Sequence, residues 1–145
     1  MSDDEQRAWR AYLAMQSRLA TELNRRLQAT SGLSLSDYAV LVELSEAEAA
    51  SLRPSEIGRD LQWEQSRLSH QLTRMERRGL LHRTECPGDR RGALIGLSEA
   101  GREALAQAAP EHAESVRSLV FDGLTSEDLA VVERFAGAVL GRLGS

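Results

Sequence analysis

Residues 63–97 constrain the fold of this chain more than any other stretch. They read WEQSRLSHQLTRMERRGLLHRTECPGDRRGALIGL. Leu68, Leu72 and Met75 recur at helical spacing, which predicts a short helix with one narrow apolar stripe. Gly79 is expected to end this helix, because glycine adopts the positive φ found just past a helix C-terminus.

The side of this helix away from the stripe carries hydroxyl, imidazole and guanidinium groups. At about 100° per residue, six polar residues lie on that side or beside the stripe, none of them a carboxylate: Ser66, Arg67, His70, Thr73, Arg74 and Arg77. A face of this kind is either solvated or a surface for nucleic acid.

Two short strands and a turn follow the helix. Residues 82–86 and 93–97 have strand-like sequences, and between them lies Pro-Gly-Asp-Arg-Arg-Gly, a turn with adjacent arginines at its tip. A further short helix precedes at residues 54–61, with Pro54 at a first helical position and Ile57 and Leu61 four residues apart. The two or three residues between the helices suit a helix-turn-helix. The expected fold class is therefore mainly α with a small β-hairpin wing, a winged helix-turn-helix.

Four segments resemble the MarR family of bacterial transcriptional regulators. They are LSLSDYAVLVEL at residues 33–44, PSEIGRDL at 54–61, SRLSHQLTRMERRGLLHR running into GDRRG, and GLSEAGRE before a long helix. The resemblance covers nearly the whole chain and implies a homodimer with one winged domain per subunit. It also implies repression or activation of nearby genes, relieved in many members by a small ligand or an oxidant.

The expected organisation is a single domain over residues 1–145, with a DNA-binding lobe at about 33–97 and dimerisation helices at about 3–31 and 98–144. Ser36 is the expected N-cap of the second helix, Ser98 that of the fifth and Thr125 that of the last. The apolar stripes of the terminal helices lie outside the winged unit, which favours a two-fold dimer over a self-contained monomeric bundle.

The charge of the chain is unevenly distributed. The net charge is −4, yet residues 53–97 hold nine arginines against six acidic residues, while the rest of the chain holds nine against sixteen. Positive charge is thus concentrated where the DNA-reading element is predicted. All eighteen basic residues are arginine, which suits bidentate contacts but also follows from a GC-rich genome.

Candidate binding residues follow from these elements. The residues expected to contact DNA are Gln65, Ser66, Arg67, Ser69, His70 and Arg74 on the recognition helix and Arg90 and Arg91 at the wing tip. His70 could equally be a plain surface residue. By the resemblance, Asp89 pairs with an arginine and shapes the wing. Trp9 and Tyr12, with Arg10 nearby, are weaker candidates for an aromatic ligand, and the alternative for both rings is the core of the dimer interface.

Other chemistries find little support in the sequence. Three histidines and one cysteine show no ligand spacing, so we expect no metal site and no cofactor. Cys86 lies near Arg83 and Arg90, which leaves a redox role open, although a plain small residue is the default. No catalytic motif occurs, and neither does a membrane span or secretory signal, so we expect a cytoplasmic non-enzyme.

The predicted function is a sequence-specific DNA-binding transcriptional regulator, expected to be a repressor. It would bind a pseudo-palindromic operator as a dimer, with half-sites about 10 bp apart, and a small aromatic or phenolic ligand is a candidate effector. The alternative is a winged-helix protein-interaction module without specific DNA binding.

Overall fold

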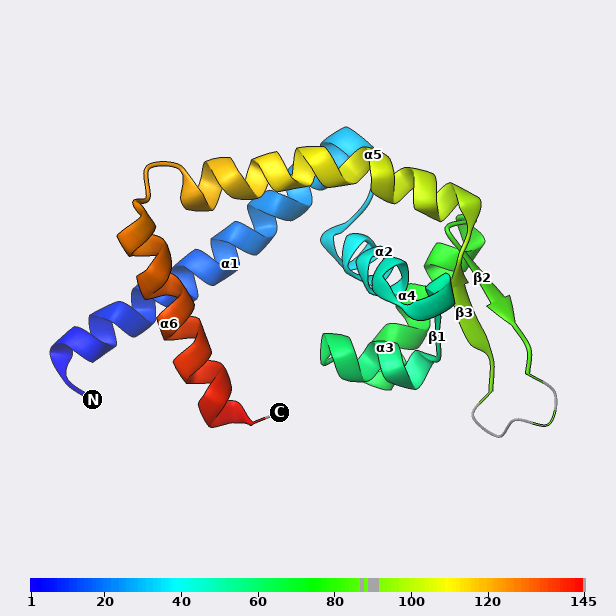
Figure 1. The fold of residues 1–145 in the computed structure, drawn as a ribbon, viewed down its shortest axis with the longest axis horizontal. Helices are drawn as coiled ribbons and strands as arrows, with labels where there is room; N and C mark the ends of the chain where they lie inside the picture. Colours follow the sequence, from blue (N-terminus) through cyan, green and yellow to red (C-terminus); the bar gives the residue numbers. More distant parts are fainter. Residues whose placement is uncertain (87, 89–91, 145) are drawn as a thin grey trace.

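The computed structural model describes residues 1–86, 88 and 92–144 and has two parts, a compact lobe and a set of long helical arms (Figure 1). The lobe contains α2 (Leu35–Glu46), a 3-10 turn (Glu48–Ala50), β1 (Ser51–Leu52), α3 (Pro54–Leu61), α4 (Gln65–Arg77), β2 (Leu81–Thr84) and β3 (Leu94–Leu97). The arms are α1 (Asp3–Ser31), α5 (Glu99–Val116), a π-helical turn (Arg117–Phe121) and α6 (Ser126–Leu143). This element order confirms the predicted winged helix-turn-helix with long terminal helices.

The sheet of the lobe has three antiparallel strands in the order β1-β3-β2. Leu81 pairs with Leu97 and Thr84 with Leu94, while Ser51 of β1 pairs with Gly96 on the other side of β3. The hairpin alone is therefore an incomplete prediction, since residues 51–52 supply a third strand. Strand β2 also begins and ends earlier than predicted, at Leu81–Thr84 rather than 82–86.

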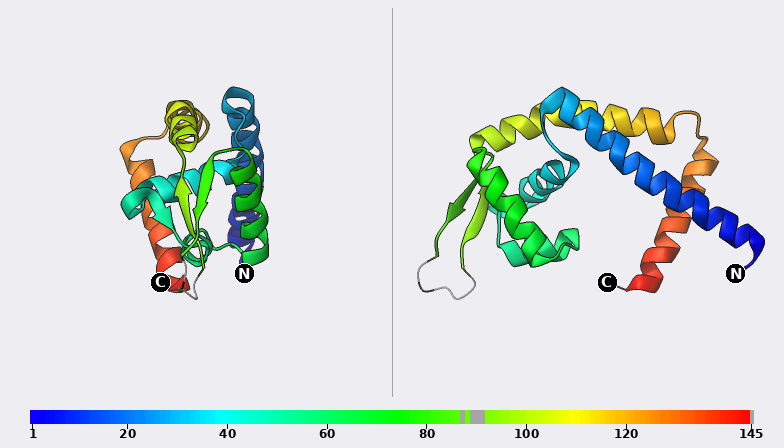
Figure 2. Two further views of the ribbon diagram at one scale, coloured as in Figure 1. Left: turned by 90° about the vertical axis from the view of Figure 1, so that its right-hand side faces the viewer. Right: turned by 180° about the vertical axis from the view of Figure 1, so that it is seen from behind.

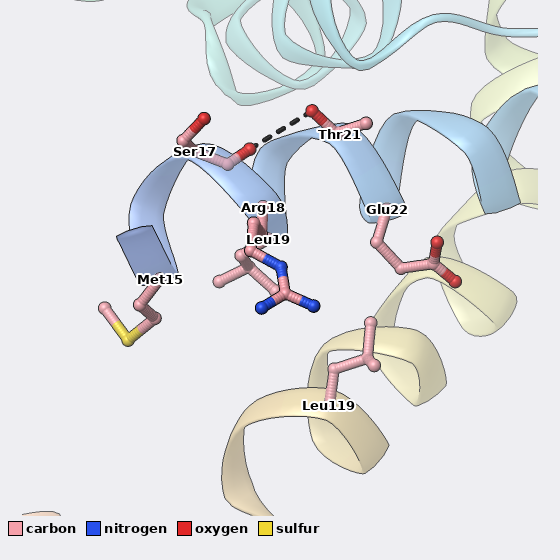
Figure 3. Close-up of a pocket in the computed structure, with 7 residues that line it drawn as sticks. All are labelled: Met15, Ser17, Arg18, Leu19, Thr21, Glu22 and Leu119. Carbon is pink, nitrogen blue, oxygen red and sulfur yellow. Dashed lines mark hydrogen bonds between the residues drawn. The ribbon is translucent and has the colours of Figure 1, made fainter. Parts of the chain in front are cut away.

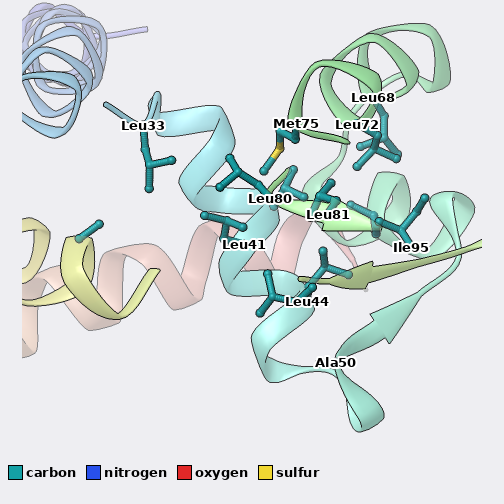
Figure 4. Packing of buried hydrophobic residues seen from close by; sticks show 14 of the residues in the cluster. Leu33, Leu41, Leu44, Ala50, Leu68, Leu72, Met75, Leu80, Leu81 and Ile95 are labelled. Carbon is teal, nitrogen blue, oxygen red and sulfur yellow. The ribbon is translucent and has the colours of Figure 1, made fainter. Parts of the chain in front are cut away.

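The core of the lobe lies where α2, α4 and the sheet meet (Figure 4). Leu68, Leu72 and Met75 are fully or almost fully buried, as the helical spacing of the stripe predicts. They pack into one cluster with apolar side chains from the rest of the lobe, among them Val40, Leu41, Leu44, Ile57, Leu81 and Ile95. Burying one whole face of α4 leaves its opposite face in solvent.

Side-chain caps fix where the helices begin. The Ser34 hydroxyl accepts the Asp37 N–H, and the Asp37 carboxylate accepts the Ser34 N–H, each at 2.9 Å. The N-cap of α2 is therefore Ser34, and the prediction of Ser36 was wrong, because only Ser34 has an acidic partner three residues further on. The predicted caps Ser98 and Thr125 are confirmed at the starts of α5 and α6.

The end of α4 is joined directly to the start of α5. Gly79 adopts φ 78°, which turns the chain out of α4 and into β2. The Ser98 hydroxyl then donates to the Gly79 carbonyl at 2.6 Å, and the Ser98 N–H donates to the Leu80 carbonyl at 3.2 Å. The first turn of a long arm is thereby attached to the end of the recognition helix.

The arms carry most of the large apolar side chains that remain in solvent. Helix α5 packs along the C-terminal part of α1, and α6 crosses nearer to the N-terminus of α1 (Figures 1 and 2). Tyr12 of α1 contacts Phe135 of α6 edge to face, with ring centroids 5.9 Å apart. Nevertheless α6 has no buried residue, and Phe135 remains 54% exposed.

Candidate nucleic-acid interface

Helix α4 presents the predicted recognition residues together on one exposed surface. The six candidates on this helix are all solvent-exposed: Gln65, Ser66, Arg67, Ser69, His70 and Arg74. Their position follows from the burial of the opposite stripe, which fixes the rotation of the helix in the lobe. This surface offers two guanidinium groups, two hydroxyls, an amide and an imidazole, all groups that hydrogen-bond phosphates or base edges.

Arg67 lies over the indole of a neighbouring tryptophan. Its guanidinium carbon is 4.2 Å from the ring centroid of Trp63, which is half-buried at the turn between α3 and α4. The other contact of the Arg67 guanidinium is a long one, 3.5 Å from Nη2 to the Ser36 hydroxyl. This cation–π contact restricts the orientation of the Arg67 side chain. It involves the face of the guanidinium group and not its N–H groups, which can still donate hydrogen bonds.

Arg74 is held by a hydrogen bond from its own helix. Its Nη2 donates to Gln71 Oε1 at 2.9 Å, and Gln71 is only 5% exposed because it lies on the buried side of α4. The Gln71 amide donates in turn to Asp37 Oδ1 of α2 at 2.6 Å. Asp37 is 4% exposed and also accepts from Arg78 Nη1 at 2.7 Å.

The ionisation of Asp37 follows from these contacts. Burial alone would raise the pKa of this carboxyl, but the hydrogen bonds from the Arg78 guanidinium, the Ser34 N–H and the Gln71 amide outweigh it. The pKa therefore lies below its ordinary value of 3.8, and the group is charged at neutral pH.

Sequence reasoning missed Asp37, Gln71 and Arg78. Two signals for them were present: Asp37 stands three residues after Ser34, as in a capping box, and Gln71 interrupts an otherwise apolar stripe. A polar residue in such a stripe requires a buried hydrogen-bond partner, but the sequence does not say where in the chain that partner lies.

The predicted wing residues Asp89, Arg90 and Arg91 lie outside the residues that the structure describes. On either side of them in the sequence lie β2 and β3. Arg83 of β2 pairs with Glu76 of α4 at 3.2 Å, and Arg53 Nη1 donates to the Gly92 carbonyl at 3.4 Å. The wing contacts with DNA remain a prediction.

The weaker ligand candidates all lie near the start of α1. Trp9 stacks on Tyr12 with ring centroids 5.7 Å apart, Tyr12 meets Phe135, and Arg10 is exposed. An open hollow lies further along α1, where Met15, Arg18, Leu19 and Glu22 approach Leu119 (Figure 3). Hydrogen bonds from Arg25 and Arg26 lower the pKa of Glu22 to about 2, so its carboxylate stays ionised and paired with these two arginines, while Arg18 adds a positive charge to the hollow.

In the part of the chain that the structure describes, no three His, Cys, Asp or Glu side chains gather closely enough to hold a metal ion. Cys86 is half-buried after β2, with its sulfur 4.0 Å from the Thr84 carbonyl. None of the described helices combines the length and apolarity that crossing a bilayer requires.

Comparison with known proteins decides the family. A family model described as the MarR family matches residues 33–92. The crystal structure of AbsC, a MarR family transcriptional regulator from Streptomyces coelicolor, is 39% identical and has a TM-score of 0.90, over 99% of this chain and 96% of that one. The chain belongs to the MarR family.

Other MarR-family structures and curated regulators resemble it as well. Sco3205 from Streptomyces coelicolor, solved in complex with DNA, is 35% identical with a TM-score of 0.90, over 96% of this chain and 87% of that one. The transcriptional repressor MprA of Escherichia coli K12 is 28% identical over 134 residues, which is 92% of this chain and 75% of MprA. These relatives are transcriptional regulators.

Proposed function

We propose that this MarR-family protein is a transcriptional repressor that binds a pseudo-palindromic DNA operator as a homodimer. The observation that carries the proposal is the exposed face of α4, where Arg67, Arg74 and four further hydrogen-bonding side chains stand opposite a buried apolar stripe. The likeness to Sco3205, which was solved with DNA, and to the repressor MprA supports it.

The dimer is supported by the surface of the arms. A compact monomer of 16.0 kDa would expose roughly 7,400 Å², whereas this chain exposes 10049 Å². Much of the apolar part of that surface lies on α6 and the first half of α1. On α6, for example, Leu140 and Leu143 are 64% and 75% exposed. This apolar surface is too extensive for a stable monomer. A two-fold partner packed on these helices would bury it.

In the proposed mechanism, the dimer sets the separation of two recognition helices. Each α4 would enter the major groove of one half-site, with half-site centres about one helical turn, or 10 bp, apart. Ser98, the N-cap of α5, is hydrogen-bonded to the carbonyls of Gly79 and Leu80, which directly follow α4. A rotation of the arms would therefore move α4 and change that separation. Operator affinity would fall accordingly.

The proposal is tested by fluorescence anisotropy of the purified protein on labelled DNA from upstream of its own gene, with unrelated competitor DNA and a salt series. Arg67→Ala and Arg74→Ala should each weaken binding, and a substitution that removes one phosphate contact per subunit should reduce the log–log salt slope by about 1.8 for the dimer. Arg25→Ala is the matched control, because Arg25 lies on α1 and pairs with Glu22.

Each outcome has a definite meaning. Binding that survives competitor, with one dimer per site and selective loss in the α4 variants, supports a dimeric regulator that binds a specific operator. Should the upstream DNA bind no better than competitor, selection of bound fragments from the whole genome follows. A selection that enriches no site would contradict the proposal and favour the winged-helix protein-interaction module.

We also propose that a small aromatic or phenolic ligand acts as the effector. Its support is the exposed Trp9 ring, which stacks on the half-buried Tyr12 and lies next to Arg10 in the sequence, although the contact of Tyr12 with Phe135 equally suits a dimer interface. Quenching of tryptophan fluorescence by an aromatic acid in wild type, and its loss in Arg10→Ala, tests this assignment.

We also propose that the protein acts in the cytoplasm, where the bacterial chromosome lies.

A further inference from the structure

A buried carboxylate lies between the recognition helix and α2. Asp37 accepts hydrogen bonds from three groups: the Gln71 amide at 2.6 Å, Arg78 Nη1 at 2.7 Å and the Ser34 N–H at 2.9 Å. Two of these donors belong to α4 or its C-cap, although they lie 34 and 41 residues away in the sequence. A charge this well buried is stable only while its donors stay in place.

Gln71 is hydrogen-bonded to Asp37 on one side and to Arg74 on the other, and these two neighbours fix the orientation of its amide group. A carboxylate only accepts hydrogen bonds, so Gln71 must turn its NH₂ group toward Asp37. The Oε1 of Gln71 then faces the other way, and it accepts from Arg74 Nη2 at 2.9 Å. Since a guanidinium only donates, this is the one arrangement of the amide that satisfies both neighbours.

The same carboxylate fixes the far end of the recognition helix. Arg78, the C-cap of α4, donates Nη1 to Asp37 and Nη2 to the Gly32 carbonyl at 3.0 Å. Gly32 is the C-cap of α1. One buried group thus holds the end of α4 against the junction of α1 and α2 while it orients Gln71 on the middle of the helix.

We propose that Asp37 and Gln71 are positioning residues for DNA recognition, which orient the Arg74 guanidinium before DNA arrives. This inference rests on the proposed function. An arginine fixed in advance loses less side-chain freedom on binding, a difference of about 2- to 12-fold in affinity per side chain. A dimer carries two such arginines, so the combined effect is about 5- to 150-fold.

The test replaces the linking amide with an apolar side chain of similar length. Gln71→Met removes both hydrogen bonds of Gln71, leaves Arg78 on Asp37, and should weaken operator binding at least about fivefold. Gln107→Met, at an exposed position of α5, is the matched control and should bind as wild type does. Circular dichroism and thermal unfolding confirm that each variant is folded.

A double-mutant cycle separates positioning from a general structural role. Arg74→Ala should cost clearly less affinity in the Gln71→Met background than in wild type, because the arginine is no longer oriented there. Equal costs of Arg74→Ala in the two backgrounds would overturn the inference.

A double exchange provides a rescue and guards against misfolding of Gln71→Met. In Asp37→Asn with Gln71→Glu, the NH₂ group of the new asparagine can donate to the new carboxylate at position 71. That carboxylate again accepts from Arg74, and the asparagine oxygen can still accept from Arg78. This pair should restore the full cost of Arg74→Ala, and failure to restore it counts against the inference.

Arginine side-chain NMR of the protein without DNA provides a measurement that needs no operator. Rotation of the Arg74 guanidinium should be slower in wild type than in Gln71→Met, and equal rotation rates would overturn the inference. If wild type lacks specific DNA binding, the proposed function fails while this NMR comparison still decides whether Gln71 orients Arg74.

Discussion

Gly101→Ala tests how closely the dimer arm approaches the end of the recognition helix. Gly101 lies in the first turn of α5, and a Cβ atom there would stand 2.2 Å from the Leu80 carbonyl oxygen and 2.9 Å from Leu97 Cδ1. Ordinary contact begins at 3.4 Å, so the backbone of α5 or of Leu80 must move by about 1.2 Å. The nearest obstacle is backbone, which cannot rotate away as a side chain does.

The expected cost combines two opposing contributions. Overpacking of this severity costs about 3 kcal/mol, and the better helix propensity of alanine returns about 1 kcal/mol. The net loss of about 2 kcal/mol should lower Tm by about 5–8 °C in a chain of this size. Operator affinity should fall as well, since the start of α5 is hydrogen-bonded to the end of α4.

Differential scanning calorimetry measures the stability, and fluorescence anisotropy measures operator binding. Gly137→Ala is the matched control, because it is also a helical glycine and nothing lies within 4 Å of its added Cβ. Sedimentation confirms that the control still dimerises. A Gly101→Ala protein as stable as wild type would refute the reasoning, because it would mean that α5 does not need this close approach.

Three further predictions concern the dimer, the buried carboxylate and the wing. Phe135→Asp should shift the protein toward monomer in sedimentation velocity, whereas an unchanged dimer would place the interface elsewhere. Asp37→Asn should lose stability at neutral pH. Because the folded pKa of Asp37 is depressed, the deficit should be full above about pH 4 and shrink as the pH falls through the folded value; a deficit independent of pH would contradict the ion pair. Arg90→Ala with Arg91→Ala should weaken DNA binding broadly and reduce its salt dependence without unfolding, and unchanged affinity would remove the wing from the interface.

The sequence by itself determined the features that depend on neighbours three or four residues apart. The stripe of Leu68, Leu72 and Met75 predicted both the helix and its exposed face, because a helix has a fixed period. The caps at Ser98 and Thr125 were predictable for the same reason, since a cap and its partner lie within one turn. The resemblance of the motifs then predicted the family, which the comparisons confirm.

Only the tertiary structure decided the contacts between distant segments. The pairing of β1 with β3, the approach of Gly101 to Leu80, and the position of Asp37 between Gln71 and Arg78 all join residues more than 20 positions apart in the sequence. No periodicity specifies such partners, because they depend on how the faces of several elements pack together. Helical period placed the arginines on the outer face of α4, and packing against α2 linked one of them, Arg74, through Gln71 to the buried Asp37.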